Sequence, residues 1–320
     1  MAYTNLHETY DMSGGVEDVM DAVYNVDPTE TPFMSNVGRG TVHNTLFEIP
    51  VDELTAASGT PRAEGFFIGD STTAVNDVTV VQNYVQINAK DYRVSGTSRA
   101  AQWYGRDDTL GYQRAKAIKE LKRDMETALL DNNSAAAGAS GTARETAGLP
   151  AWIKTNVDMS ATNGASPVWT TLVNDERSDG VQRAFTETIL KSVVKQVWDS
   201  GGDPSLLMVG SFNKQAVSAF AGIADQRVSV SLGGQVPIIG AADFYQSDFG
   251  VLAVIPNRFQ RARDAFVIDP EYAEVQFLRP VEFHELAKVG DGDGEFVLAE
   301  FGLAVKNEKA HGIAADLTTS

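Results

Sequence analysis

Residues 106–133 read RDDTLGYQRAKAIKELKRDMETALLDNN, and this stretch decides the fold. Its apolar residues recur at spacings of three and four, which places them on one face of a helix. They are Leu110, Ala117, Ile118, Leu121, Met125, Ala128 and Leu129. Asp107 or Asp108 is expected to cap the helix, because a carboxylate accepts the first free N–H groups. At 1.5 Å per residue such a helix is about 40 Å long and crosses a whole domain.

The opposite face of this helix is charged. It carries Lys116, Lys119, Glu120, Lys122, Arg123, Asp124 and Glu126. Lys122 and Glu126 are one turn apart, a spacing that favours an ion pair on a helix surface. The pattern predicts a helix that packs one face on a core and shows the other to solvent or to a partner.

Composition places the chain among ordinary globular proteins. Its 320 residues include 43% hydrophobic and 22% charged residues, enough for one large domain or two medium ones. No run of eighteen apolar residues predicts a membrane span, and the N-terminus lacks the basic and apolar regions of a secretory signal. There is no cysteine, which excludes disulfides and thiolate metal sites and fits a reducing cytoplasm.

The net charge of −17 is unevenly distributed along the chain. Residues 1–89 hold thirteen acidic residues and only two basic ones, Arg39 and Arg62, and the first lysine is Lys90. Tight nucleic-acid binding is not expected, because it requires clustered lysine and arginine at the phosphates. Weak, non-specific contact with nucleic acid stays open, and most of the acidic residues are expected on a solvated surface.

The residues before the long helix predict an arm followed by a hairpin. Residues 1–45 suggest one short helix around residues 16–23 and then an extended connector. Residues 46–51 (LFEIPV) predict a strand, and its expected partner is residues 80–94, where apolar and polar residues alternate.

The two expected strands are separated by nearly thirty residues without apolar periodicity. A connection of that length usually belongs to a functional or partner-binding loop. An isolated hairpin is marginally stable in water, so this one is expected to rest on a neighbouring chain.

The residues after the long helix predict an α/β unit and then a run of strands. Residues 132–144, rich in alanine, serine and glycine, are expected to form a boundary and hinge. The expected α/β unit has a helix at 185–199 ended by Gly201-Gly202, a second helix capped by Ser211 and ended by Gly222, and strands at 206–209, 236–239 and 251–255. Later strands are expected at 265–268, 272–278, 281–286 and 296–306, with the turn 290–294 joining the last two.

No motif for catalysis or metal binding stands out. The four histidines, His7, His43, His284 and His311, have no paired-ligand spacing. Residues 290–295 (GDGDGE) lack the twelve-residue spacing of a calcium loop and predict a turn. No GxSxG, Walker or GxGxxG motif is present. The chain is therefore not expected to be an enzyme, and no cofactor, metal or small-molecule substrate is expected.

The order of these elements resembles the major capsid protein of tailed bacteriophages, which has the Hong Kong 97 fold. The segments 277–280 (FLRP), 286–288 (LAK), 307–312 (NEKAHG) and 200–204 (SGGDP) carry the local resemblance. It implies an α+β fold of an N-terminal arm, an extended loop, a peripheral domain with a long spine helix, and an α/β axial domain. These parts correspond to 1–45, to 46–94, to 95–144 with 269–320 (spine helix 106–133), and to 145–268.

The resemblance also implies a function. Such a chain is expected to self-assemble into hexamers and pentamers of an icosahedral virion capsid around double-stranded DNA, in the cytoplasm of a host bacterium. Scaffold, decoration and portal proteins are implied as further partners. Some members cross-link through a lysine in the extended loop, but residues 46–89 contain none, so hydrophobic and ionic contacts are expected to hold the shell. The short N-terminal region leads us to expect a separate scaffold or an already removed scaffolding segment.

Two contacts between subunits are predicted. The acidic residues of the hairpin (Glu48, Asp52, Glu53, Glu64, Asp70 and Asp77) are expected to face a basic surface on the neighbouring helix, formed by Lys116, Lys119, Lys122 and Arg123. Phe66 and Phe67, beside Arg62 and Glu64, are expected to anchor the loop tip in an adjacent subunit, because exposed paired aromatics act as anchors.

Two other functions remain open from the sequence. An encapsulin-like compartment would share the fold but would package enzymes rather than DNA. A cytoplasmic α/β enzyme, with a site near Ser211 or Asp269, would instead be a small soluble species with a deep pocket.

Overall fold

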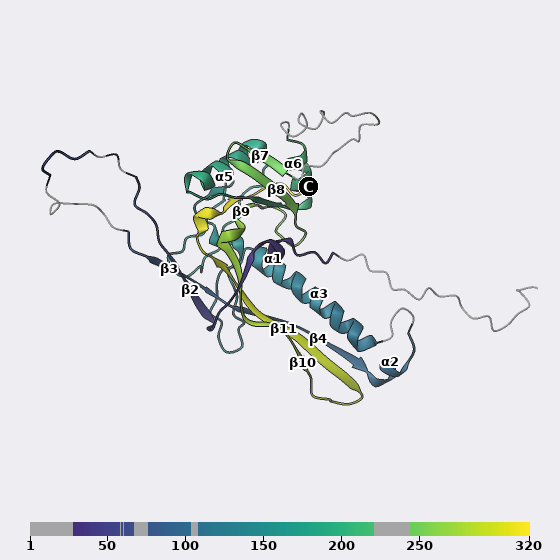
Figure 1. The fold of residues 1–320 in the computed structure, drawn as a ribbon. Helices are drawn as coiled ribbons and strands as arrows, with labels where there is room; N and C mark the ends of the chain where they lie inside the picture. The colour runs from purple at the N-terminus through teal and green to yellow at the C-terminus, as the bar shows by residue number, and fades with distance from the viewer. Residues whose placement is uncertain (1–27, 58, 60, 67–75, 104–107, 221–243) are drawn as a thin grey trace, which may run out of the picture.

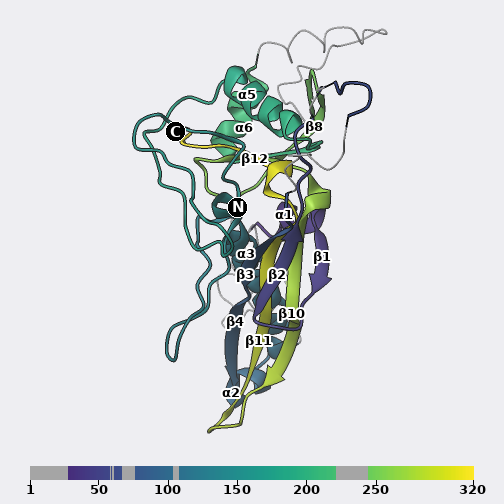
Figure 2. The same ribbon diagram turned by 90° about the vertical axis from the view of Figure 1, so that its left-hand side faces the viewer.

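The computed structural model describes residues 28–320 apart from residues 58, 60, 67–75, 104–107 and 221–243. The expected helix near residues 16–23, the expected strand 236–239, Gly222, Phe67 and Asp70 therefore lie outside the described residues. The chain forms an elongated body. One end holds α5, α6 and β8, and the other holds α2 and the far ends of β4, β10 and β11 (Figure 2).

The predicted long helix is confirmed as α3, Thr109–Leu130. Asp108 is its N-cap, and its Oδ1 accepts a hydrogen bond from Leu110 N at 3.0 Å. The helix ends at Leu130 rather than Asn133, with Asp131 as C-cap. The expected apolar stripe is largely buried, because α3 lies along a β-sheet (Figure 1).

That sheet has four strands in the order β1-β10-β11-β4. The strands are β1 (Gly38–Thr41), β10 (Ala273–Glu285), β11 (Gly292–Val305) and β4 (Gln86–Ser95), and the short helix α2 (Gly96–Ala100) follows β4. The predicted hairpin of the last two strands is confirmed, but residues 272–278 and 281–286 form the single strand β10. Pro280 lies where the register of β10 shifts, since proline cannot donate to the ladder.

The predicted strand 46–51 is confirmed as β2, Leu46–Val51, and it pairs antiparallel with β3, Thr79–Tyr84. The prediction of one partner strand over 80–94 was wrong, because the chain changes sheets after Tyr84 and β4 pairs with β11. Asn83 holds this crossing point: its buried amide donates to Leu303 O at 2.8 Å and accepts from Ala147 N at 2.9 Å.

The prediction of an extended connector before β1 was also wrong in part. Residues Pro32–Asn36 form the short helix α1, with proline in its first turn, where no N–H partner is lost. Phe33 and Met34 of α1 are buried in the main core, which also contains Leu121, Met125 and Leu129 of α3.

A second sheet of six strands has the order β5-β12-β9-β6-β8-β7. Its strands are β5 (Val157–Asp158), β12 (Gly312–Ala314), β9 (Ala265–Ile268), β6 (Leu206–Val209), β8 (Gly250–Pro256) and β7 (Phe244–Ser247). The predicted strands 206–209, 251–255 and 265–268 are confirmed here. Residues 269–320 were predicted to form one domain with the long helix, whereas β12 pairs with β9 inside this second sheet.

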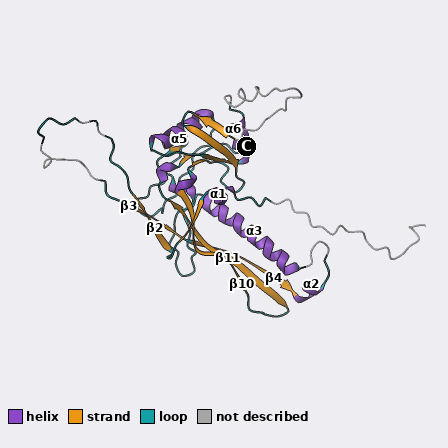
Figure 3. Ribbon diagram, viewed as in Figure 1, coloured by secondary structure: helices purple, strands orange, loops and turns teal. Residues whose placement is uncertain are grey.

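Helices α5 (Glu187–Asp199) and α6 (Ser211–Ser218) cover one face of the six-stranded sheet (Figure 3). Ser211 was predicted to be the N-cap of α6, and this was wrong. Ser211 is the first residue of the helix, and the N-cap is Gly210. Gly201, at φ +91°, follows α5 in the left-handed conformation expected of a helix stop.

Side chains alternate across the six-stranded sheet. In β6, Leu207 and Val209 join the core beneath α5 and α6, whereas Leu206 and Met208 join the main core with α3. The short elements α4 (Leu149–Trp152), η4 (Pro270–Tyr272) and η5 (Glu308–Ala310) complete the described fold. A continuous main core therefore links the two sheets, which fixes the spine helix relative to the α/β unit.

Candidate functional site

The basic face of α3, which we define as Lys116, Lys119, Lys122 and Arg123, is only partly available to a partner. Lys116 Nζ lies 3.7 Å from Glu120 Oε1 one turn away. The Arg123 guanidinium lies 5.4 Å from the centroid of the Phe259 ring and is half-buried. Lys119 and Lys122 are exposed, and neither has an ion-pair partner in the part of the chain that the structure describes. These two lysines are the free cations of the basic face.

The two other acidic residues of the predicted polar face are also engaged within the chain. Asp124 Oδ2 lies 2.6 Å from Lys90 Nζ and ties α3 to β4. Glu126 was expected to pair with Lys122, and this prediction was wrong, because Glu126 is fully buried. The helical period alone does not reveal this, since the covering residues come from α1 and from the segment after β8.

Glu126 joins three parts of the molecule. Its Oε1 accepts hydrogen bonds from Phe33 N at 2.7 Å and from Asn257 Nδ2 at 2.7 Å. Its Oε2 accepts from Met34 N at 3.0 Å. Burial raises the pKa of the Glu126 carboxyl, and the hydrogen bonds from Met34, Phe33 and Asn257 oppose the rise. The carboxylate therefore satisfies the first N–H groups of α1 and holds the arm on the spine helix.

The acidic residues of the hairpin are largely exposed. Glu48 accepts a hydrogen bond from Gln82 of the paired strand, and Glu53 Oε2 lies 2.7 Å from Lys309 Nζ. Asp52, Glu64 and Asp77 are exposed and have no ion pair among the described residues. Glu53 is thus partly neutralised within its own subunit, and the other three carboxylates remain available to a partner.

The described part of the loop tip carries a cation stacked on an aromatic ring. The Arg62 guanidinium lies 4.8 Å from the centroid of the Phe66 ring, and Phe66 is 49% exposed. Phe67, the second predicted anchor, lies outside the described residues. A half-exposed phenylalanine at a projecting tip is available to a neighbouring surface.

The base of the hairpin is seated closely on β11. A Cβ at Gly302 would lie 2.9 Å from Phe47 Cε1 and 3.0 Å from Tyr84 O, so only glycine allows this approach. Phe47 is buried with Val85 and Ala304 in a small core between the hairpin and the sheet. The direction of the hairpin is therefore set by its contact with the four-stranded sheet.

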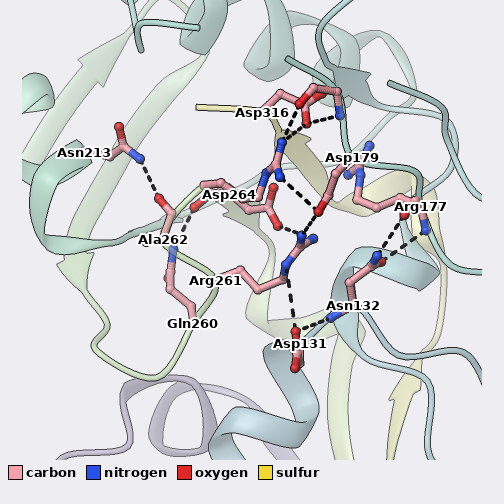
Figure 4. A network of polar contacts seen from close by, with 12 residues as sticks. Asp131, Asn132, Arg177, Asp179, Asn213, Gln260, Arg261, Ala262, Asp264 and Asp316 are labelled. Atoms are coloured by element: carbon pink, nitrogen blue, oxygen red, sulfur yellow. Dashed lines mark hydrogen bonds and ion pairs between the residues drawn. The ribbon is translucent and has the colours of Figure 1, made fainter. Parts of the chain in front are cut away.

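A cluster of arginine and aspartate residues, which was not predicted, lies beyond the C-terminal end of α3 (Figure 4). Its members, called here the Arg–Asp cluster, are Asp131, Arg177, Asp179, Arg261, Arg263, Asp264 and Asp316. They are scattered over the sequence, so no motif or spacing could have identified them.

Arg261 lies at the centre of the Arg–Asp cluster. It pairs with Asp264 at 3.0 Å and with Asp179, and its Nε lies 3.8 Å from Asp131 Oδ1 at the end of α3. Arg263 pairs with Asp179 at 3.0 Å and with Asp316 at 2.8 Å. The cluster thereby connects the spine helix, two loops and the C-terminal segment.

Burial changes the proton affinity of two members of the Arg–Asp cluster. It lowers the pKa of Arg177, against the attraction of Asp264 and Asp316. It raises the pKa of Asp264 to about 6, against the attraction of Arg261 and Arg177. Both groups lie among opposite charges, although Arg177 Nη1 and Nη2 and Asp264 Oδ1 have no hydrogen-bond partner among the described residues.

The positions considered for an enzyme site have structural roles. Asp269 Oδ1 accepts a hydrogen bond from Glu271 N at 3.1 Å and caps η4, and Ser211 begins α6. Within the described ranges, no group of three or more histidine, aspartate or glutamate residues could hold a metal ion. The same residues contain no helix with the length and apolar character needed to cross a membrane.

Comparison with known proteins gives consistent matches. The profile of the family described as SU10 major capsid protein matches residues 2–318. The "Major capsid protein" of Escherichia phage Phieco32 is 32% identical over 135 residues, which are 42% of this chain and 38% of that protein. The aligned region therefore spans less than half of this relative.

Solved structures share the fold over nearly the whole chain. A chain of the cyanophage A-1(L) capsid asymmetric unit matches with a TM-score of 0.69 at 10% identity, covering 99% of this chain and 100% of that one. A chain of the holo-SrpI encapsulin complex from Synechococcus elongatus PCC 7942 matches with a TM-score of 0.54 at 10% identity, covering 96% and 93%. The mixed helix and sheet fold is thus that of the Hong Kong 97-like shell proteins.

Proposed function

The chain belongs to the SU10 major capsid protein family and is a structural protein of a phage capsid, and we propose that it assembles as hexamers and pentamers into a closed icosahedral shell around double-stranded DNA. The match of the family profile to residues 2–318 carries this conclusion. The cyanophage capsid chain supports it through the shared fold.

The shell is held by many weak contacts that act together. Each subunit lends its hairpin loop to neighbours. Within the arm (residues 1–45), α1 and β1 instead pack inside the subunit and form the rigid body together with the spine helix, the four-stranded sheet and the α/β unit. Weak contacts made simultaneously give a large combined affinity. Contacts between different surfaces of identical subunits close into rings when the rotation allows it. Because residues 46–89 contain no lysine, these contacts are hydrophobic and ionic rather than covalent lysine cross-links.

The acidic residues of the β2–β3 hairpin bind the basic face of a neighbouring spine helix. Lys119 and Lys122 support this pairing, because they are exposed and lack an ion-pair partner among the described residues. Asp52, on the hairpin, is exposed and equally unpaired there. Opposite charges on two surfaces set the register of the contact and speed association.

Other partners follow from the same role. Scaffold, portal and decoration proteins bind the shell, and packaged DNA makes weak, non-specific contact with it. Assembly takes place in the cytoplasm of the host bacterium. The subunit acts without catalysis, cofactor, metal or small-molecule substrate.

Size-exclusion chromatography with electron microscopy of the purified full chain tests the proposal. Megadalton shells or rings of five or six subunits are expected. A species that stays monomeric or dimeric at all protein concentrations and salt conditions would contradict shell formation.

An encapsulin-like compartment is a second candidate, favoured by the structural match to the SrpI encapsulin chain. The contents of the particles separate the two functions. A phage head requires phage partners to fill with DNA, whereas a compartment forms alone and encloses protein. Ultraviolet absorbance and mass spectrometry of purified particles measure both contents.

A further inference from the structure

A cavity of about 700 Å³ opens beside the base of the hairpin loop. Its floor is apolar and includes Trp152, Trp169, Val81 and Val305, and the two tryptophan rings meet edge to face with centroids 6.0 Å apart. Its volume is in the range of pockets that enclose a ligand, so it has room for side chains of another segment.

One group beneath the floor of this cavity is buried without a partner. Trp152 is 1% exposed, and its indole Nε1–H has no hydrogen-bond acceptor within the described residues. This nitrogen is sealed below the surface, so the indole offers apolar contact to an occupant rather than a hydrogen-bond donor.

The rim of the cavity carries one free carboxylate. Asp77 is exposed and has neither an ion pair nor a hydrogen bond in the described part of the chain. Its charged neighbours are engaged. Lys309 pairs with Glu53 at 2.7 Å, and Lys154 Nζ lies 3.8 Å from the centroid of the Trp169 ring.

The remaining acidic group, Glu308, is also satisfied. It is buried and accepts hydrogen bonds from Lys154 N at 3.3 Å and Thr155 N at 3.2 Å. The cavity therefore favours an occupant with a cation for Asp77 and apolar bulk for the floor.

We propose that residues 61–66 of a second copy of this chain occupy the cavity. Arg62 is the only arginine or lysine between residues 46 and 89, and its guanidinium stacks 4.8 Å from the Phe66 ring centroid. The segment thus brings a cation for Asp77 and an aromatic ring for the apolar floor. This inference rests on the proposed function, since it requires self-assembly.

The arrangement of the loop makes the contact intermolecular. The described part of the loop between β2 and β3 projects away from both sheets, whereas the cavity lies at its base, beside Val51 and Thr79 (Figure 1). Each copy then donates a tip and receives one. A tip-to-base contact of this kind joins different surfaces and propagates around a ring.

The contact is separate from the one proposed for the basic face. The basic face attracts the acids of the loop, whereas the cavity binds Arg62 and Phe66. Substitutions at Lys119 and Lys122 therefore leave the cavity intact, whereas Asp77 at the cavity is also one of the hairpin acids expected to face the basic face.

Cross-linking in shells of the full chain tests the proposal, because the natural sequence has no cysteine that would react. The chain with Ala63→Cys, an exposed position that keeps Arg62 and Phe66, and Thr170→Cys at the cavity wall is assembled and treated with a short bis-maleimide. The matched control combines Ala63→Cys with Val289→Cys, an exposed residue beside the β10–β11 turn. Electron microscopy checks that each variant forms shells.

A ladder of cross-linked multimers, at least about tenfold stronger than in the control, is expected because docking holds the two thiols at high effective concentration. Co-assembly of separate Ala63→Cys and Thr170→Cys chains should give cross-linked dimers. Shells without a ladder, or cross-links only within one chain, would overturn the docking while leaving the proposed function intact. Failure of the unmodified chain to form any shell would instead overturn the proposed function and the docking with it.

Charge exchange provides a second measurement. Arg62→Asp and Asp77→Arg should each lower the dissociation temperature of the shell, and the double variant should recover most of the loss. Both side chains are exposed, so subunit folding is expected to be unchanged. Equal dissociation temperatures for the unmodified chain and both single variants would count against the contact.

Discussion

Glu126 Oε1 on the spine helix accepts a hydrogen bond from the backbone N–H of Phe33, 2.7 Å away, although 93 positions separate the two residues in the sequence. The same carboxylate receives Met34 N and Asn257 Nδ2, so one side chain fastens the arm and the segment after β8 to α3. The charge at this point of the helix serves the interior of the subunit rather than its surface.

Glu126→Ala is expected to destabilise the subunit by about 3 kcal/mol, because it leaves buried donors on Phe33, Met34 and Asn257 without an acceptor. Urea unfolding of the dissociated subunit measures the free energy. Glu126→Gln keeps one acceptor oxygen and should lose less. Glu120→Ala, at a half-buried position of the same helix, is the control, and an equal loss in both alanine variants would refute the proposed role of Glu126.

The elements that the sequence predicted well are those whose burial follows a simple period. The strands at 46–51, 206–209 and 265–268 were found with the predicted bounds, because runs of apolar residues with local alternation determine them. The spine helix was found for the same reason, and its cap at Asp108 was recognisable from the residue type.

The predictions were wrong or incomplete where contacts between residues far apart in the sequence determine the structure. No periodicity shows that the chain leaves the hairpin at Tyr84, because the buried amide of Asn83 fixes that crossing through Leu303 and Ala147. Burial of Glu126 depends on α1, and the Arg–Asp cluster unites residues from distant segments. The loop tip and the basic face were selected from the sequence by exposure and charge, and they remain predictions about contacts between subunits.

Reversing the two free lysines of the basic face should impair assembly. Lys119→Glu with Lys122→Glu would repel the acidic residues of the neighbouring hairpin. The yield of shells is expected to fall at least about tenfold. The subunit should still fold, because both side chains are exposed, and circular dichroism of the soluble fraction checks this. The double variant Lys195→Glu with Lys288→Glu changes the net charge equally at other exposed positions and should retain the shell yield. An unchanged yield for the Lys119 and Lys122 variant would exclude the pairing.

Removing the aromatic anchors should weaken the shell without affecting the subunit. Phe66→Ser with Phe67→Ser removes the ring that is 49% exposed at Phe66 together with its neighbour. Because apolar anchors at an interface each contribute more than about 1 kcal/mol, shells should dissociate at lower temperature or urea concentration. Light scattering follows dissociation, and urea unfolding of the free subunit should be the same for both chains. Shells as stable as those of the unmodified chain would disprove the anchoring role.

Acidification should destabilise the subunit through His311. This side chain is fully buried, its Nδ1 accepts a hydrogen bond from Asp269 N at 3.3 Å, and burial lowers its pKa to about 4. In the unfolded chain the histidine pKa is about 6.5, so the unfolded state takes up the proton first as the pH falls. The contribution of neutral His311 is therefore complete above pH 6.5 and is lost progressively between pH 6.5 and 4, by about 2 kcal/mol at pH 5. Urea unfolding at pH 7 and pH 5 should show this loss in the unmodified chain and not in His311→Gln, which does not titrate. Equal pH dependence of the two chains would mean that His311 is not held neutral by burial.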